Sequence, residues 1–302
     1  MRDRGQGTED RGWTTENRKK SVLCLLLFVV CLLSPVPCLL ISSSAFTEDS
    51  SSSLNLGVDY AKKGEWDKAI ENLEKALRLD PSRPEIYIDL SLAYSEKKNF
   101  EGAVRYAEKA VELGPKKSNA YHTLGLAYEH AGDTPKAIAA YKQGIRADSK
   151  NSDLYLTLGN LYGRQGNLDL AGKAYEQAIQ SDPRNVFAYS NLAYLHEQEG
   201  KLDEAMPDFV KATQLDPSDS VAWYDLGLAY NKKEDTAKAI ESFKKSFDLD
   251  PKFYKACMSL AIAYDKKRDS KKAAEYYTQA LSLTDDPRLK EAILKQITGT
   301  KK

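Results

Sequence analysis

The sequence predicts an all-α protein built from a repeated pair of helices. A leucine-containing motif and one alanine each recur every 34 residues, and apolar residues inside each unit follow the helical spacing of three and four. The motifs are NLGVDY, DLSLAY, TLGLAY, TLGNLY, NLAYLH, DLGLAY and SLAIAY, beginning at residues 55, 89, 123, 157, 191, 225 and 259. The alanines are Ala69, Ala103, Ala137, Ala171, Ala205, Ala239 and Ala273. Because nothing interrupts this spacing, the pattern indicates one continuous array.

Composition agrees with a folded protein and argues against a nucleic-acid partner. Hydrophobic residues make up 42% of the 302 residues, which is enough for a core. Lys plus Arg and Asp plus Glu number 44 each, so the chain lacks the positive charge expected of a protein that follows phosphates. The four cysteines, Cys24, Cys31, Cys38 and Cys257, match neither a disulfide framework nor a zinc motif.

Residues 1–45 are predicted to be a membrane-targeting segment. The run from Ser21 to Ile41 carries no charge and follows the basic residues Arg18 to Lys20. Two interpretations stay open: a signal peptide cleaved after Ala45, or a retained anchor, since 21 helical residues reach across a hydrocarbon core of about 30 Å. Both interpretations place the following residues outside the cytosol. We therefore expect an exported protein, periplasmic or extracellular, or a membrane-anchored one, with residues 46–49 as a flexible tether.

Each 34-residue unit is expected to form a hairpin of two helices. In the fourth unit Tyr155, Leu158 and Tyr162 make an apolar stripe on the first helix, and Ala171 and Tyr175 make one on the second. Each hairpin leaves apolar surface that only the next hairpin can cover. The array is therefore expected to be stabilised by stacking.

The helix ends also follow from the sequence. Small residues at Gly159 and Ala171 are expected to let the two helices approach closely. Gly166 suits a left-handed helix end, and Asn167 suits an N-cap. Pro207 falls inside a second helix and is expected to kink or delay it. Prolines at the ends of second helices are Pro81, Pro115, Pro183, Pro217 and Pro251.

Residues 50–287 resemble the tetratricopeptide repeat family, which implies a right-handed α-solenoid. The sixth unit shows the resemblance through Trp223, Leu226, Gly227, Tyr230, Ala239, Phe243 and Pro251. The implied repeats are 50–83, 84–117, 118–151, 152–185, 186–219, 220–253 and 254–287. Residues 288–302 are expected to form a capping helix and tail, with Leu289, Ala292, Ile293 and Ile297 on one face.

Catalytic and cofactor sites are not predicted. The sequence has no glycine-rich phosphate loop, nucleophile elbow or HExxH motif. His122 and His130 lie about 12 Å apart along one predicted helix, too far to share a metal ion. His196 falls on a packing stripe. We therefore expect no enzyme activity, no cofactor and no metal site.

The resemblance implies a groove, lined by the first helices, that binds a protein or peptide partner. One short polar residue per repeat faces this groove: Asn55, Asp89, Thr123, Thr157, Asn191, Asp225 and Ser259. Related repeat proteins use Asn at this position to grip a peptide main chain; alternatively, Asn is simply common there. The candidate groove residues are Asp89, Leu92, His122, Thr123, Leu126, Leu156, Thr157, Asn160, Asn191, Tyr194, Tyr224, Asp225 and Leu228. Four carboxylates, Glu85, Asp89, Glu96 and Glu129, against Lys62 predict that the groove of repeats one to three is acidic, whereas the charges of repeats four to seven cancel.

The leading functional hypothesis is an exported or membrane-tethered adaptor that holds an extended segment of a partner. Two alternatives stay open: a non-catalytic recognition or accessory subunit of an enzyme complex, and a structural repeat that self-associates. The segment before Ala45 contacts membrane if it is not cleaved. The sequence does not identify the partner.

Overall fold

The computed structural model describes residues 49–299, and these residues form fifteen α-helices and no strand. The expectations for residues 1–48 lie outside the described residues. First helices of the seven repeats are α2 (Ser50–Lys62), α4 (Pro84–Glu96), α6 (Ser118–His130), α8 (Ser152–Arg164), α10 (Val186–Gln198), α12 (Ser220–Lys232) and α14 (Tyr254–Lys266). Second helices are α3 (Trp66–Leu79), α5 (Phe100–Leu113), α7 (Thr134–Ala147), α9 (Leu168–Ser181), α11 (Leu202–Leu215), α13 (Thr236–Leu249) and α15 (Ser270–Ser282), and α16 (Pro287–Gly299) follows. The predicted all-α solenoid is confirmed.

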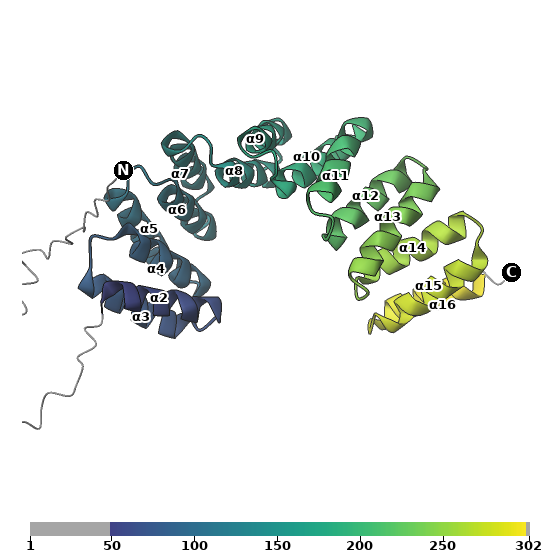
Figure 1. The fold of residues 1–302 in the computed structure, drawn as a ribbon, viewed down its shortest axis with the longest axis horizontal. Coiled ribbons are helices and arrows are strands. Elements are labelled where there is room, and N and C mark those ends of the chain that lie inside the picture. Colours follow the sequence, from purple (N-terminus) through teal and green to yellow (C-terminus); the bar gives the residue numbers. More distant parts are fainter. Residues whose placement is uncertain (1–48, 300–302) are drawn as a thin grey trace, which may run out of the picture. The chain divides into compact units, whose positions relative to one another are not determined.

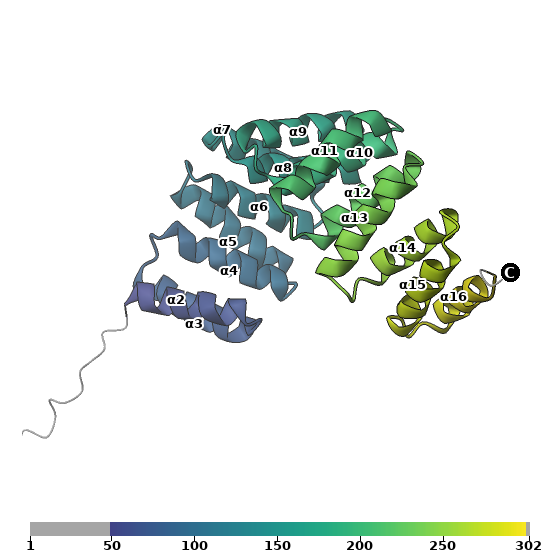
Figure 2. The ribbon, with the colours of Figure 1, turned by 45° about the vertical axis from the view of Figure 1, so that its right-hand side comes forward.

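The helices pack in the order of the chain (Figures 1 and 2). Each first helix packs against the second helix of its own repeat, and each second helix packs against the first helix of the next repeat. First helices also touch one another directly, as α4 touches α6 and α8 touches α10. Within the described residues, successive second helices do not contact one another to the extent that these first helices do. The first helices therefore place their outward side chains next to one another along one face, called here the first-helix face.

Glycines inside four of the first helices, at Gly57, Gly125, Gly159 and Gly227, let those hairpins close over a large side chain. A Cβ added at Gly159 would lie only 2.6 Å from Cε1 of Tyr175. Real Cβ atoms do not approach other atoms this closely, so only glycine fits there without movement of the ring. In the second repeat Ser91 replaces the glycine, and the small Ala107 replaces the aromatic ring. The predicted close approach at Gly159 and Ala171, which is fully buried, is confirmed.

The turn inside each repeat requires a left-handed residue. Gly166 has a φ of +76°, as its predicted role requires. The same position is held at positive φ by residues other than glycine in three repeats: Lys98, Glu234 and Arg268. Asn167 occupies the N-cap of α9 but makes no capping hydrogen bond. Asp235 does cap α13, because its Oδ1 accepts a hydrogen bond from the Lys238 backbone N–H at 3.1 Å.

The expectation that Pro207 delays its helix is wrong. Helix α11 runs from Leu202 to Leu215 with Pro207 inside it, and it begins at the same repeat position as α9 and α13. The hydrogen bond that Pro207 cannot donate would go to the carbonyl of Asp203, in the first turn. Asp203 is exposed, so water can satisfy that carbonyl.

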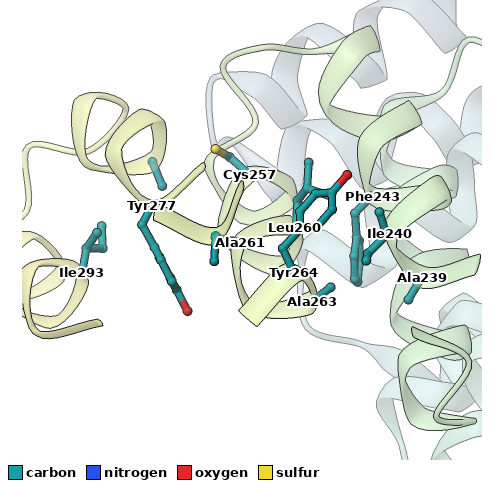
Figure 3. Packing of buried hydrophobic residues seen from close by; sticks show 12 residues of the cluster. Ala239, Ile240, Phe243, Cys257, Leu260, Ala261, Ala263, Tyr264, Tyr277 and Ile293 are labelled. Carbon is teal, nitrogen blue, oxygen red and sulfur yellow. The ribbon is translucent and has the colours of Figure 1, made fainter. Parts of the chain in front are cut away.

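The first repeat exposes polar residues at its outer end, and an additional helix covers the outer end of the last repeat. In the first repeat Ser52 and Asp59 are exposed at positions where the third repeat buries Ala120 and Ala127. At the other end α16 packs against α15. Ile293 is buried in the core of the last two repeats, where Tyr277 lies between α16 and α14 (Figure 3). Ile297 packs against the same core, whereas Leu289 and Ala292 are exposed.

Candidate functional site

The candidate groove residues all lie on first helices, and the structure places them at different depths. Thr123 is buried. Leu92 and Tyr194 are exposed, with 41% and 45% of their surface accessible. The remaining candidates are half-buried: Asp89, His122, Leu126, Leu156, Thr157, Asn160, Asn191, Tyr224, Asp225 and Leu228.

A chain of hydrogen bonds joins the polar positions of repeats four and five. The Asn191 Nδ2 donates to Asn160 Oδ1 at 2.7 Å. The Tyr175 hydroxyl donates to the same oxygen at 2.9 Å, so two donors fix the Asn160 amide. Because Tyr175 is held against Gly159, the packing of the hairpin also sets the orientation of Asn160. The amide pair is therefore preorganised without any partner.

A cavity of about 350 Å³ adjoins this pair of amides, between α8 and α10. It is lined by Asn160, Gly163, Arg164, Leu168, Tyr175, Asn191, Tyr194, Leu195 and Gln198. Three of these, Asn160, Asn191 and Tyr194, are residues that the sequence assigned to the groove. The cavity combines amide groups with the exposed Tyr194 ring, which suits a peptide main chain with an apolar side chain.

The Thr157 side chain of the polar ladder is engaged within the protein. Thr157 Oγ1 donates to the Asp153 carbonyl oxygen at 2.8 Å, and it lies 3.2 Å from His122 Nε2. Burial lowers the pKa of His122, so its imidazole is neutral at neutral pH. These two side chains connect α6 and α8. They contribute to the stacking of repeats three and four.

Asp89 and Asp225 are the two candidate groove residues that carry a carboxylate. Each is half-buried, and within residues 49–299 neither carboxylate has a hydrogen bond or an ion pair. Burial raises the pKa of each to about 6. A nearby carboxylate adds to the effect in both cases, Glu85 beside Asp89 and Glu197 beside Asp225. Each of these two positions therefore presents an acceptor that the fold itself leaves unsatisfied.

Phe187 and Val221 belong to the same face but were missed by sequence reasoning. They are 70% and 52% exposed, and they occupy the second position of α10 and of α12. Phe187 lies seven residues before Tyr194, which places both on one side of α10. The signal was available, because other repeats have polar residues at this position: Ser51, Glu85, Asn119, Asp153 and Lys255. An exposed ring at a normally polar position is typical of a binding surface.

Ion pairs neutralise two of the four carboxylates in the predicted acidic half of the groove. Lys117 forms an ion pair with Glu85. Arg164 forms one with Glu129, which also accepts a hydrogen bond from the Tyr141 hydroxyl. Both cations come from outside the first helix that carries the carboxylate, so a count of charges along one helix overestimates the negative charge of this half.

The other titratable groups do not converge on a metal or a reactive centre in the described part of the chain. No group of three His, Cys, Asp or Glu residues there is arranged to hold a metal ion. Cys257 is buried, its Sγ lies 3.3 Å from the Tyr276 carbonyl oxygen, and burial raises its pKa to about 11. Its thiol is therefore unreactive at neutral pH. Between residues 49 and 299 no helix is long and apolar enough to cross a membrane.

Solved structures with the same architecture show what this chain is similar to. The C-terminal part of a TPR repeat-containing protein from Cytophaga hutchinsonii matches with a TM-score of 0.62 and 20% identity, over 78% of this chain and 97% of that chain. PilF from Pseudomonas aeruginosa matches with a TM-score of 0.60 and 19% identity, over 72% and 98%. A thermophilic TPR protein from Thermus thermophilus matches with a TM-score of 0.50 and 25% identity, over 60% and 98%. These matches show the fold.

Family profiles place the same repeat along the array. A profile described as TPR repeat matches residues 57–98 and 130–166. Profiles described as tetratricopeptide repeat match residues 84–117, 106–139, 156–220, 220–253 and 256–291. A comparison with curated proteins finds no significant match. Because these profiles together cover the helical array from residue 57 to residue 291, the chain belongs to the tetratricopeptide repeat family.

Proposed function

We propose that the protein is an adaptor that holds an extended segment of a protein partner on the first-helix face of repeats four to six. The tetratricopeptide fold supports a protein interaction scaffold in general, and such proteins are typically not catalytic. One observation carries the location: Phe187 and Tyr194 are exposed on one side of α10, beside a cavity that Asn160 and Asn191 line. Preorganised amides next to exposed aromatic rings suit a peptide in extended conformation.

The energetics favour the aromatic residues as anchors. An aromatic side chain that becomes fully covered at an interface is typically worth about 2 kcal/mol or more, whereas a charge at the rim mainly changes the association rate. The Tyr194 ring packs against the Phe209 ring in an edge-on geometry, with the ring centroids 6.5 Å apart. The ring is thus positioned before a partner arrives. We expect Tyr194→Ala to weaken partner binding by about 30-fold or more.

Site-specific photocrosslinking tests this proposal. A photoreactive amino acid is placed at Phe187 or at Tyr194 in the full-length protein, and the crosslinked peptides are identified by mass spectrometry. Leu170, on second helix α9, is the matched control because it is as exposed as Tyr194, at 44%. We expect crosslinks from Phe187 and Tyr194 to one segment of another protein, and none from Leu170. Crosslinks from Leu170 alone would move the binding surface to the second helices, and crosslinks to a second copy of the chain would indicate self-association.

We also propose that the repeats lie outside the cytosol, exported or held at a membrane. The uncharged run from Ser21 to Ile41, directly after Arg18 to Lys20, supports this. Fractionation of cells that produce the full-length chain, with N-terminal sequencing of the product, distinguishes cleavage after Ala45 from a retained anchor. An uncleaved protein found only in the cytosol would contradict the proposal.

A further inference from the structure

Asp225 lies in the proposed groove beside two tyrosines and has no partner within the described protein. Tyr224 precedes it on α12. One repeat earlier the equivalent side chains Asn160 and Asn191 are 2.7 Å apart, so Tyr194 and Asp225 occupy positions that face each other between α10 and α12. Burial raises the pKa of the Tyr194 hydroxyl, and the Asp225 carboxylate adds to this rise. Glu197 and Asp219 add negative potential at Asp225. The carboxylate therefore lies in an anionic environment.

The lysine and arginine side chains of this face do little to neutralise the negative charge of Asp225. Lys232 is engaged with Glu197 at 2.9 Å, and Arg164 is engaged with Glu129. Lys255 acts on Asp225 from α14 and lowers its pKa, but this is the smallest of the influences on that carboxylate. Desolvation of a carboxylate without a partner is unfavourable, so a cation supplied from outside would relieve a cost that is already present in the free protein.

We propose, on the basis of the proposed groove function, that Asp225 with Tyr194 and Tyr224 receives a lysine or arginine side chain of the partner segment. A carboxylate attracts the cation, and tyrosine rings attract it further through cation–π interaction. Phe187 and Val221, exposed at the start of α10 and of α12, would contact an apolar side chain near that basic residue. The partner of this stretch is thus a segment in which a basic residue adjoins a large apolar one.

Glu241 provides the control for this inference. It lies on second helix α13, in the same repeat as Asp225, and it is exposed. Glu241→Gln therefore removes an equal charge from the same repeat without changing the first-helix face.

The test selects random decapeptides displayed on phage against the full-length protein. Sequencing of the bound phage should show lysine or arginine within two positions of a large apolar residue, enriched several-fold over the starting library. For a selected peptide, we expect Asp225→Asn to weaken binding by about tenfold or more and to abolish the enrichment of basic residues. Glu241→Gln should leave both unchanged. Circular dichroism of each variant checks that the helices are intact.

The outcomes separate this inference from the proposed function. If Tyr194→Ala abolishes selection while Asp225→Asn still selects basic residues, the groove function stands and the role of Asp225 is wrong. An equal loss with Glu241→Gln and Asp225→Asn would show an effect of net charge rather than a site, and would also overturn the inference. If neither Tyr194→Ala nor Asp225→Asn changes the selected peptides, both proposals fail.

Discussion

The ring of Tyr175 lies against Gly159, and the hydroxyl of the same ring holds the Asn160 amide at 2.9 Å. One side chain thus connects the packing of the fourth hairpin with the candidate groove. A change at Gly159 should be detectable both in stability and in the geometry of the amide pair formed by Asn160 and Asn191.

Gly159→Ala is expected to destabilise the array by about 1–3 kcal/mol, because the added Cβ overlaps the Tyr175 ring. Gly163→Ala is the matched control: it lies one turn later on α8, and its nearest neighbour would be the Tyr175 hydroxyl at 3.7 Å. There we expect a gain of about 0.5–1 kcal/mol, as for any open helical glycine replaced by alanine. Urea unfolding followed by circular dichroism measures both. A stable Gly159→Ala protein would contradict the close packing.

The left-handed residue of the turn predicts one stabilising and one destabilising substitution. Glu234 has a φ of +62° at a position where four other repeats have glycine. Glu234→Gly should raise the free energy of unfolding by up to about 1 kcal/mol, because the strain at the Cβ is removed. Gly200→Ala, at the equivalent turn with a φ of +77°, should lower it by a similar amount. Thermal unfolding of the two variants should shift in opposite directions, and a shift in the same direction would be inconsistent with this explanation.

Asp225 predicts a pH dependence of stability. Its folded pKa is raised to about 6, above an ordinary value of 3.8, so between these values the folded state holds a proton that the unfolded state has released. Stability should therefore fall as pH rises from about 4 to about 6, and should stay lower above that range. At pH 7.5, Asp225→Asn should raise the free energy of unfolding, measured with urea, by about 1–2 kcal/mol over the parent. At pH 4 the two proteins should differ little.

Asp89 should contribute in the same direction, because burial and Glu85 raise its pKa to about 6 as well. The double variant Asp89→Asn with Asp225→Asn should lose more of the pH dependence than either single variant. If Asp225→Asn were less stable than the parent at pH 7.5, the carboxylate would have to have a partner within the protein.

The sequence predicted the architecture well because the period is a local property of the chain. The 34-residue spacing, the left-handed Gly166 and the stripe that buries Leu158 all follow from residues near one another in sequence. The delay predicted for Pro207 does not occur, because the carbonyl that it leaves without a donor belongs to the exposed residue Asp203 in the first turn of α11. That exposure is a property of the folded array.

The candidate site was predicted less completely, because it depends on contacts between repeats. Tyr194 was expected in the groove and is exposed there, whereas Phe187 was overlooked. Glu129 was counted as a free negative charge, but Arg164, one repeat further along, forms an ion pair with it. Pairing across repeats is set by side-chain reach in three dimensions, and the spacing of residues within one repeat does not reveal it.

The helix α16, which covers Tyr277 through Ile293, has a consequence for the synthesis of the chain. During translation each hairpin emerges before the one that will cover it, so the newest apolar face of the nascent array is always bare. The last of these faces is closed only when α16 has left the ribosomal exit tunnel and Ile293 can pack against Tyr277. We therefore expect a nascent array that stops before α16 to bind chaperones more strongly than one that includes it.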